Sequence, residues 1–134
     1  MQDNSKLSPD DVELIQIASD HIKKRYEEGL TSIGAALRTK SGKIFTGSNL
    51  KYRIRNTCTC GGATAIHTAL NDGEKELDTL VEIKYIPETD QYIVVNACGQ
   101  CRQLHNYNLP LSVIIDNKGV LEVVPAEQLL PYPF

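Results

Sequence analysis

The feature that most constrains how this chain folds is the position of three cysteines at the predicted starts of two helices. Cys98 and Cys101 form a C-x-x-C pair in a turn that opens a helix, and Cys60 stands where an earlier helix begins. The C-x-x-C spacing lets two thiolates bind one ion, and zinc is the metal that most often takes three thiolates with one open position. Helix N-termini also favour thiolates, because their unpaired N–H groups carry partial positive charge. We therefore predict Zn²⁺ as the cofactor, held by Cys60, Cys98 and Cys101.

Other interpretations of the four cysteines stay open. The C-x-x-C pair could instead be a redox disulfide or a pair of buried thiols. Cys58 is ambiguous, because a fourth thiolate would close the site and make it structural. The polar start from Met1 to Leu7 lacks the apolar run of a secretion signal, so we expect reduced cysteines and a cytoplasmic protein.

Length and charge limit the classes of function. The 134 residues match the size of one ordinary domain, so we expect a single domain over residues 1–134. The net charge of -3 gives no broad positive field for phosphate contacts, which disfavours nucleic acid as a partner. No stretch approaches the roughly 20 apolar residues of a membrane span, which disfavours a membrane partner. A small-molecule substrate or ligand is the partner that we expect.

Hydrophobic periodicity predicts helices that alternate with strands. A helix begins at Ser8 as its N-cap and ends by Gly29, and the segment from Ile33 to Leu50 indicates a hairpin. The other predicted elements are a helix from Cys60 to Gly73, strands over 81–85, 92–95, 111–115 and 120–124, a short helix after Cys98 and another from Pro125. This order fits a mixed sheet that is covered on both faces by helices.

Five short motifs follow one another along the chain. They are Gly34-Ala35-Ala36-Leu37, Gly47-Ser48-Asn49-Leu50, the segment from Cys60 to Ile66, the segment from Ala97 to Gln103, and Leu129-Leu130-Pro131. In this order they resemble the cytidine deaminases, a family that includes blasticidin-S deaminase. The resemblance implies an α/β, three-layer α-β-α cytidine-deaminase-like fold with a mixed five-stranded sheet. It also implies a zinc-dependent hydrolase of a small amino-substituted pyrimidine-like compound, assembled as a homo-oligomer, either a dimer or a tetramer.

The chain departs from this family at the catalytic glutamate. In the zinc deaminases the metal converts water to hydroxide, and a glutamate that is not a ligand shuttles protons. Gly62 stands at that place, and the nearest downstream carboxylates, Asp72 and Glu74, lie beyond the helix. Because general acid/base assistance contributes roughly 10² to 10⁴ in rate, its loss should cripple deamination, and we assign no catalytic residue. The alternative is therefore an inactive homologue that binds zinc and a ligand or partner.

The substrate pocket implied by the resemblance departs from the family as well. Asn49 matches the asparagine that contacts ribose in nucleoside deaminases, but Lys51 replaces the glutamate two residues later. Thr31 stands where an aromatic side chain stacks on the pyrimidine. We expect Asn49, Lys51 and Gly61 to contact a substrate that differs from plain cytidine.

Charged and titratable side chains near these motifs have two interpretations each. On an extended segment Lys51, Arg53 and Arg55 would share one face, where they could receive a phosphate or carboxylate or could form a solvated edge. His67 and His105 could carry protons near neutral pH, although packing on a helix face is the simpler interpretation.

Overall fold

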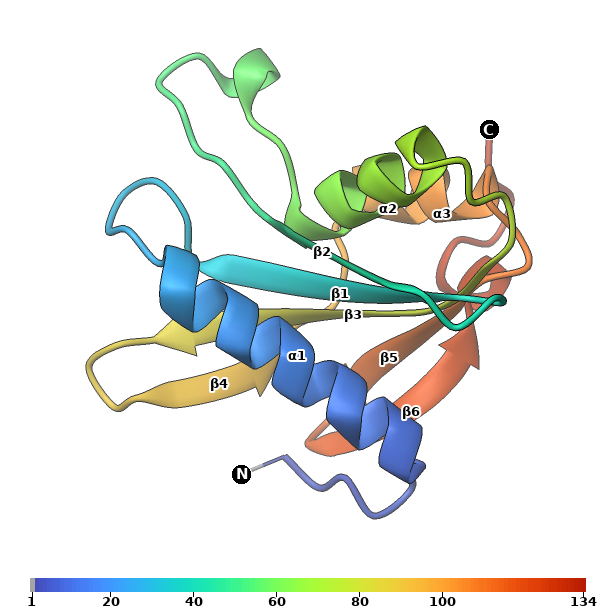
Figure 1. Cartoon of the computed structure of the whole chain (residues 1–134), viewed down its shortest axis with the longest axis horizontal. Coiled ribbons are helices and arrows are strands. Elements are labelled where there is room, and N and C mark those ends of the chain that lie inside the picture. The colour runs from blue at the N-terminus through green and yellow to red at the C-terminus, as the bar shows by residue number, and fades with distance from the viewer. Residues whose placement is uncertain (1) are drawn as a thin grey trace.

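In the computed structural model, which describes residues 2–134, three α-helices cover the two faces of one mixed sheet (Figure 1). The helices are α1 (Pro9–Arg25), α2 (Gly61–Asn71) and α3 (Gly99–Asn106). The strands are β1 (Ile33–Thr39), β2 (Ile44–Ser48), β3 (Leu77–Ile86), β4 (Gln91–Val94), β5 (Ser112–Asn117) and β6 (Val120–Pro125). Helix α1 lies on one face of the sheet, and α2 and α3 lie on the other, which confirms the predicted order of layers.

The sheet runs in the order β2-β1-β3-β5-β6, and β4 pairs with β3 outside this path. Over the described residues it therefore has six strands, one more than the five predicted. The cause is the length of β3, because its ten residues offer one edge to two partners, β5 at residues 79 and 80 and β4 at residues 83–86. The pair β3 and β5 is parallel, and the other pairs named here are antiparallel.

Helix α1 begins where the sequence predicts and is fixed by reciprocal capping. The Asp11 N–H donates to the Ser8 hydroxyl, and the Ser8 N–H donates to the Asp11 carboxylate. The helix ends at Arg25, and the predicted terminator Gly29 lies in the turn that follows. The apolar side of α1 packs against one face of the sheet. The buried side chains of this cluster include Leu14 and Ala18 of α1, and Ala36, Val81 and Ile83 of the strands.

The opposite face of the sheet carries α2 and α3. Buried side chains of α2 pack on β1 and β3 in a second cluster, which includes Ala35, Leu37, Ala65, Ile66, Ala69 and Leu80. Helix α2 lies so close to β2 that a Cβ at Gly47 would be 2.7 Å from the Ala65 backbone nitrogen. This close packing of small residues sets the N-terminus of α2 over the sheet, beside the N-terminus of α3 (Figure 1).

The remaining predicted elements are present, with ends that differ by a few residues. The predicted helix from Pro125 is a 3-10 turn over Ala126–Leu129. Residues 51–54 form no strand; they belong to a loop that projects from the sheet and leads through a 3-10 turn, Arg55–Thr57, to α2 (Figure 1). Within the described range no helix combines the length and the apolar character needed to cross a bilayer.

Candidate active site

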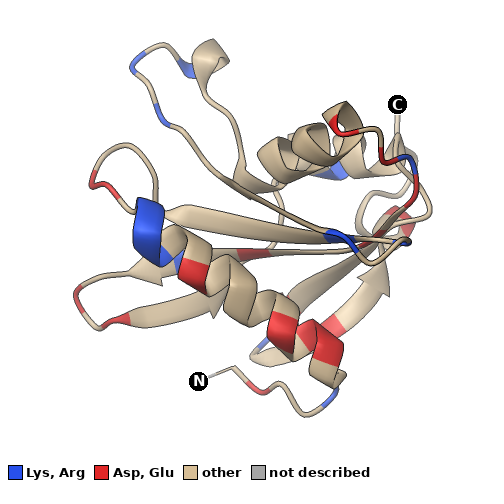
Figure 2. Ribbon diagram, in the orientation of Figure 1, with Lys and Arg blue, Asp and Glu red and all other residues tan. Residues whose placement is uncertain are grey.

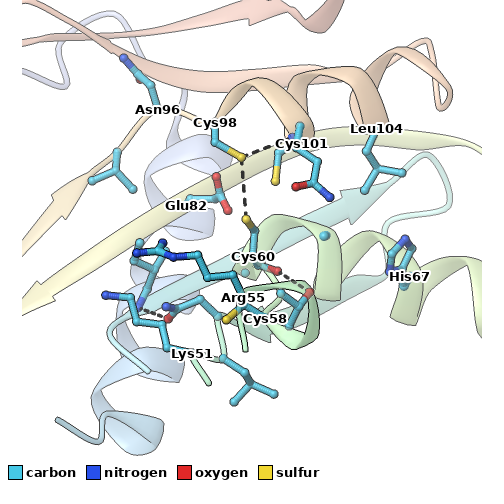
Figure 3. Close-up of a pocket in the computed structure, with 18 residues that line it drawn as sticks. Lys51, Arg55, Cys58, Cys60, His67, Glu82, Asn96, Cys98, Cys101 and Leu104 are labelled. Carbon is cyan, nitrogen blue, oxygen red and sulfur yellow. Dashed lines mark hydrogen bonds between the residues drawn. The ribbon is translucent and has the colours of Figure 1, made fainter. Parts of the chain in front are cut away.

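Three thiols converge between the N-termini of α2 and α3 (Figure 3). Cys60 is the N-cap of α2, Cys98 is the N-cap of α3, and Cys101 lies in the first turn of α3. Their sulfur atoms all lie within 4.8 Å of one another, and the Sγ atoms of Cys60 and Cys98 are 3.8 Å apart. Two sulfurs held at about 2.3 Å by a tetrahedral zinc ion would be separated by about 3.8 Å. The three thiols are therefore positioned for one zinc ion.

Burial raises the pKa values of these thiols, whereas the N–H groups at a helix N-terminus lower them. Burial raises the pKa of Cys60 and of Cys101. Burial also acts to raise the pKa of Cys98, but hydrogen bonds from the Cys101 and Gln100 N–H groups and from the neighbouring thiols lower that pKa overall. Cys98 is therefore the most easily ionised of the three, and a bound cation would supply the charge that lets the other two ionise.

Cys58 does not join this group of thiols. Its Sγ accepts a hydrogen bond from the Tyr52 N–H at 3.2 Å, within the loop between β2 and α2. Among the described residues, the group that could hold a metal ion consists of Cys60, Cys98 and Cys101. The site is therefore open at one tetrahedral position, as catalytic zinc sites are.

A cavity of about 650 Å³ opens beside the three thiols, a size typical of small-molecule sites. Each of the residues predicted to contact substrate lines it, namely Asn49, Lys51 and Gly61. The same cavity is lined by all three thiol residues, so a compound bound there would lie against the open metal position.

The side chain of Asn49 is held in a fixed orientation. Its Oδ1 accepts hydrogen bonds from the N–H groups of Ser32 and Ile33 at 2.9 and 2.8 Å, and from the Thr31 hydroxyl at 3.2 Å. Thr31 is thus a buried partner of Asn49 and offers no stacking surface. With the Asn49 oxygen occupied in this way, its amide nitrogen is the atom available to donate to a ligand.

The carboxylate of Glu82 also lines the cavity, although the sequence motifs do not single it out. Glu82 comes from β3, is only 7% exposed, and lies beside Cys98 and Cys60 (Figure 3). Its Oε1 accepts a hydrogen bond from the Gly62 N–H at 2.7 Å. Burial raises the pKa of Glu82, and the hydrogen bond from Gly62 opposes that rise. An acidic group is therefore present in the cavity although residue 62 is glycine.

Asp72 and Glu74, the nearest carboxylates downstream in the sequence, lie beyond helix α2 as expected, but the sequence motifs do not reveal that Glu82 lies beside the thiols. Asp72 forms an ion pair with Lys43 at 3.4 Å, and Glu74 accepts a hydrogen bond from Ser41, both beyond the C-terminal end of α2. The signal that points to Glu82 is its position within an apolar strand, directly between Val81 and Ile83. A carboxylate that is buried in this way needs a partner or a function.

The three cations of the loop lie around the mouth of the site. Lys51 and Arg55 line the cavity, and Lys51, Arg53 and Arg55 together line a second, smaller pocket. Figure 2 shows these basic positions on the projecting loop between β2 and α2, away from the acidic residues of α1. They do gather in one place, but on a loop and a 3-10 turn and not along the predicted extended segment.

The two candidate histidines have different surroundings. His67 is exposed on α2 and lines the cavity. His105 is fully buried in α3, and burial lowers its pKa to about 4. Neither ring nitrogen of His105 has a hydrogen-bond partner among the described residues, and His105 does not line the cavity. His105 therefore packs as an uncharged side chain.

Sequence and structure comparisons agree with this geometry. Residues 8–109 match the model of the family described as "Cytidine and deoxycytidylate deaminase zinc-binding region". A blasticidin-S deaminase from Bacillus cereus is 35% identical over 132 residues, which cover 96% of this chain and 94% of that protein. A cytidine deaminase from Sporosarcina psychrophila is 30% identical over 105 residues, which cover 76% of this chain and 74% of that protein.

Solved structures show the same fold. The crystal structure of cytidine deaminase from Burkholderia pseudomallei superposes with a TM-score of 0.74 at 28% identity, covering 92% of this chain and 98% of that one. The cytidine deaminase from Bacillus anthracis superposes with a TM-score of 0.77 at 24% identity, covering 92% and 88%. Fold and thiol site together define a zinc-binding deaminase domain. The chain belongs to the cytidine and deoxycytidylate deaminase family.

Proposed function

We propose that this protein is a zinc-dependent hydrolase that removes the amino group from a small pyrimidine-like compound other than plain cytidine. The observation that carries the proposal is the group formed by Cys60, Cys98 and Cys101. Its 3.8 Å sulfur separation fits zinc, and it borders a cavity of about 650 Å³. An open three-thiolate site beside a cavity suits hydrolysis better than a purely structural role.

The chain's own residues hold the substrate at this site. When bound, zinc supplies a Lewis acid that makes water nucleophilic near neutral pH. The Asn49 amide nitrogen and the backbone of Gly61 offer neutral polar contacts, while Val95 and Leu104 add apolar surface for a flat ring. The net reaction replaces a ring C–NH₂ group by C=O, consumes water and releases ammonia.

The loop cations favour a substrate with an anionic group distant from the reacting amine. The Lys51 ammonium and the Arg55 guanidinium line the same cavity as the thiols, and both suit a carboxylate or a phosphate. Blasticidin S is the first compound to test, because the 35% identical relative is named a blasticidin-S deaminase. Cytidine monophosphate tests the preference for phosphate.

A second candidate is a homologue without deaminase activity, in which zinc supports the fold and the cavity only binds a ligand or partner. Gly62 favours it, because helix α2 lacks the glutamate that the family resemblance places there. Glu82 argues against it, because a buried carboxylate costs stability, and such a group beside a cavity and a metal site is typical of catalytic sites.

Metal analysis and an ultraviolet deamination assay separate the two candidates. Purified protein should contain about one zinc per chain. It should deaminate at least one of blasticidin S, cytidine, deoxycytidine and cytidine monophosphate, with cytidine slower than the best compound. A folded, zinc-loaded protein that binds members of this panel and deaminates none would support the second candidate and overturn the first.

Assembly and cellular location stay predictions for this chain. A dimer or tetramer is what the resemblance implies, and light scattering coupled to size-exclusion chromatography measures it directly. Fluorescence microscopy of a tagged full-length chain measures whether the protein is cytoplasmic.

A further inference from the structure

We propose that Glu82, reaching the site from strand β3, is the proton-transferring carboxylate of this enzyme and replaces the glutamate expected at position 62. The inference rests on the proposed function, because it names the residue that moves protons in that reaction. A Cβ built on Gly62 would lie 2.9 Å from Glu82 Oε1 and 3.1 Å from its Cδ. A side chain at residue 62 and the Glu82 carboxyl group therefore compete for the same space, and the end of the Glu82 side chain would have to shift to admit one.

The alternation of side chains along β3 explains how Glu82 reaches this space. Val81 and Ile83 pack on the side of α1, whereas Leu80 and Glu82 point to the side of α2. Glu82 is paired with Ala35 of β1, a fully buried residue with a small side chain. Because Ala35 occupies so little volume, the longer Glu82 side chain can extend toward the first turn of α2.

One oxygen of the carboxylate is anchored while the other is available. Gly62 lies in the first turn of α2, where backbone N–H groups lack partners within the helix. Its N–H donates to Glu82 Oε1 at 2.7 Å. Among residues 2–134, Oε2 has no hydrogen-bond partner, and Glu82 lines the cavity together with all three thiols. This arrangement presents a fixed carboxylate to a molecule bound at the open metal position.

The chemistry of deamination gives this carboxylate two proton transfers. The first proton passes from water to the ring nitrogen as the new C–O bond forms at the amino-bearing carbon. The second passes from the new hydroxyl group to the amino group as the C–N bond breaks. Ammonia then leaves, the ring carbon keeps the oxygen as a carbonyl, and the Glu82 carboxylate is regenerated.

A purely structural role for Glu82, as a cap for α2, makes a different prediction. Glutamine at residue 82 keeps a carbonyl oxygen that can accept the Gly62 hydrogen bond, but it cannot carry a proton. Glu82→Gln should therefore keep the zinc content and the melting temperature of the wild type and lower kcat by roughly 10² to 10⁴ on the best substrate of the panel. Asp72→Asn, at the carboxylate paired with Lys43, is the matched control and should keep wild-type kcat.

Transfer of the acidic group from residue 82 of β3 to residue 62 of α2 tests whether the two positions serve the same site. Glu82→Ala should lose activity, and adding Gly62→Glu to it should recover at least about tenfold, because a carboxylate again reaches the site. Gly62→Glu alone should not raise activity, because the two carboxyl groups would crowd each other.

Thermal unfolding tests the same geometry without an activity measurement. Gly62→Ala should change the melting temperature less favourably in the wild type, where the new Cβ meets the end of the Glu82 side chain, than in Glu82→Ala, where only Leu80 Cδ2 at 3.3 Å remains close. The difference between the two backgrounds measures the coupling between residues 62 and 82. Equal effects of Gly62→Ala in the two backgrounds would show that residues 62 and 82 do not share a space, and would overturn the inference.

Failure of this inference and failure of the proposed function give different results. Turnover by the wild type that persists within twofold in zinc-loaded Glu82→Gln overturns the role of Glu82 and leaves the proposed function intact. No turnover of any panel compound by a folded, zinc-loaded wild type overturns the proposed function and this role with it. Loss of turnover in Glu82→Gln together with loss of zinc assigns Glu82 to metal binding and also overturns the inference.

Discussion

The backbone N–H of Gly62 and the carboxylate of Glu82 lie 2.7 Å apart, which ties the first turn of α2 to strand β3 directly beside the three thiols. The contact joins two unusual features of this chain, a helix that begins with two glycines and a buried strand that carries an acid. Glycine at residue 62 leaves the space that the Glu82 carboxyl group fills. The acidic group of the site is thus a product of tertiary packing, with no trace in the local motif around Cys60.

Replacement of Cys98 by serine tests the metal site. Cys98→Ser should lower zinc affinity by more than about 100-fold and lower the melting temperature, because the group of three thiols loses its most easily ionised member. Elemental analysis and differential scanning fluorimetry measure the two effects. Cys58→Ser makes the same change at a thiol outside the group and should keep zinc. If Cys98→Ser kept its zinc and Cys58→Ser lost it, Cys58 and not Cys98 would be the zinc ligand.

Substitution of Gly47 tests the packing that positions α2. Gly47→Ala should lower the free energy of unfolding by about 1–3 kcal/mol, because the added methyl group would lie 2.7 Å from the backbone nitrogen of Ala65. Urea denaturation measures the change. Gly99→Ala is the control, since a Cβ there meets nothing within 4 Å. Equal stability of the two variants would mean that α2 lies farther from β2 than described.

Reversing the charge of Lys51 tests the substrate preference. Residue 51 lines the cavity, and the family resemblance places a glutamate there in nucleoside deaminases. Lys51→Glu should therefore strengthen binding of cytidine, whose sugar is neutral. It should weaken binding of cytidine monophosphate, because a carboxylate repels the phosphate. Isothermal titration measures both affinities, and Lys51→Gln separates loss of the positive charge from gain of a negative one. Unchanged affinities for both compounds would remove residue 51 from the substrate contacts.

The buried histidine predicts how stability depends on pH. The pKa of His105 falls from 6.5 to about 4 on folding, so as pH drops below about 6.5 the unfolded chain binds a proton that the folded chain does not. This effect is absent above pH 6.5 and removes about 2 kcal/mol of stability by pH 5. His105→Leu should therefore lose less stability than the wild type between pH 7.5 and pH 5. Parallel losses in the two proteins would contradict a neutral, buried His105.

Local patterns were sufficient to predict the helix caps and the thiols. Ser8 and Cys98 cap α1 and α3 with their side chains, and Cys60 stands at the N-cap position of α2, because helix starts depend on residues that are neighbours in the chain. Glu82 could not be placed in the same way. The alternation of Val81 and Ile83 is typical of a strand with one polar face, whereas β3 is covered on both faces. Which helix lies over residue 82 is decided by contacts far apart in the sequence.

A crystal structure of the zinc-loaded protein measures the central relationship of this site most directly. We predict a single zinc ion at about 2.3 Å from the sulfurs of Cys60, Cys98 and Cys101, with the Glu82 carboxylate beside the fourth position and still bonded to the Gly62 N–H. A zinc ion bound by Cys58 as a fourth thiolate, or a Glu82 side chain turned away from the metal, would contradict this account.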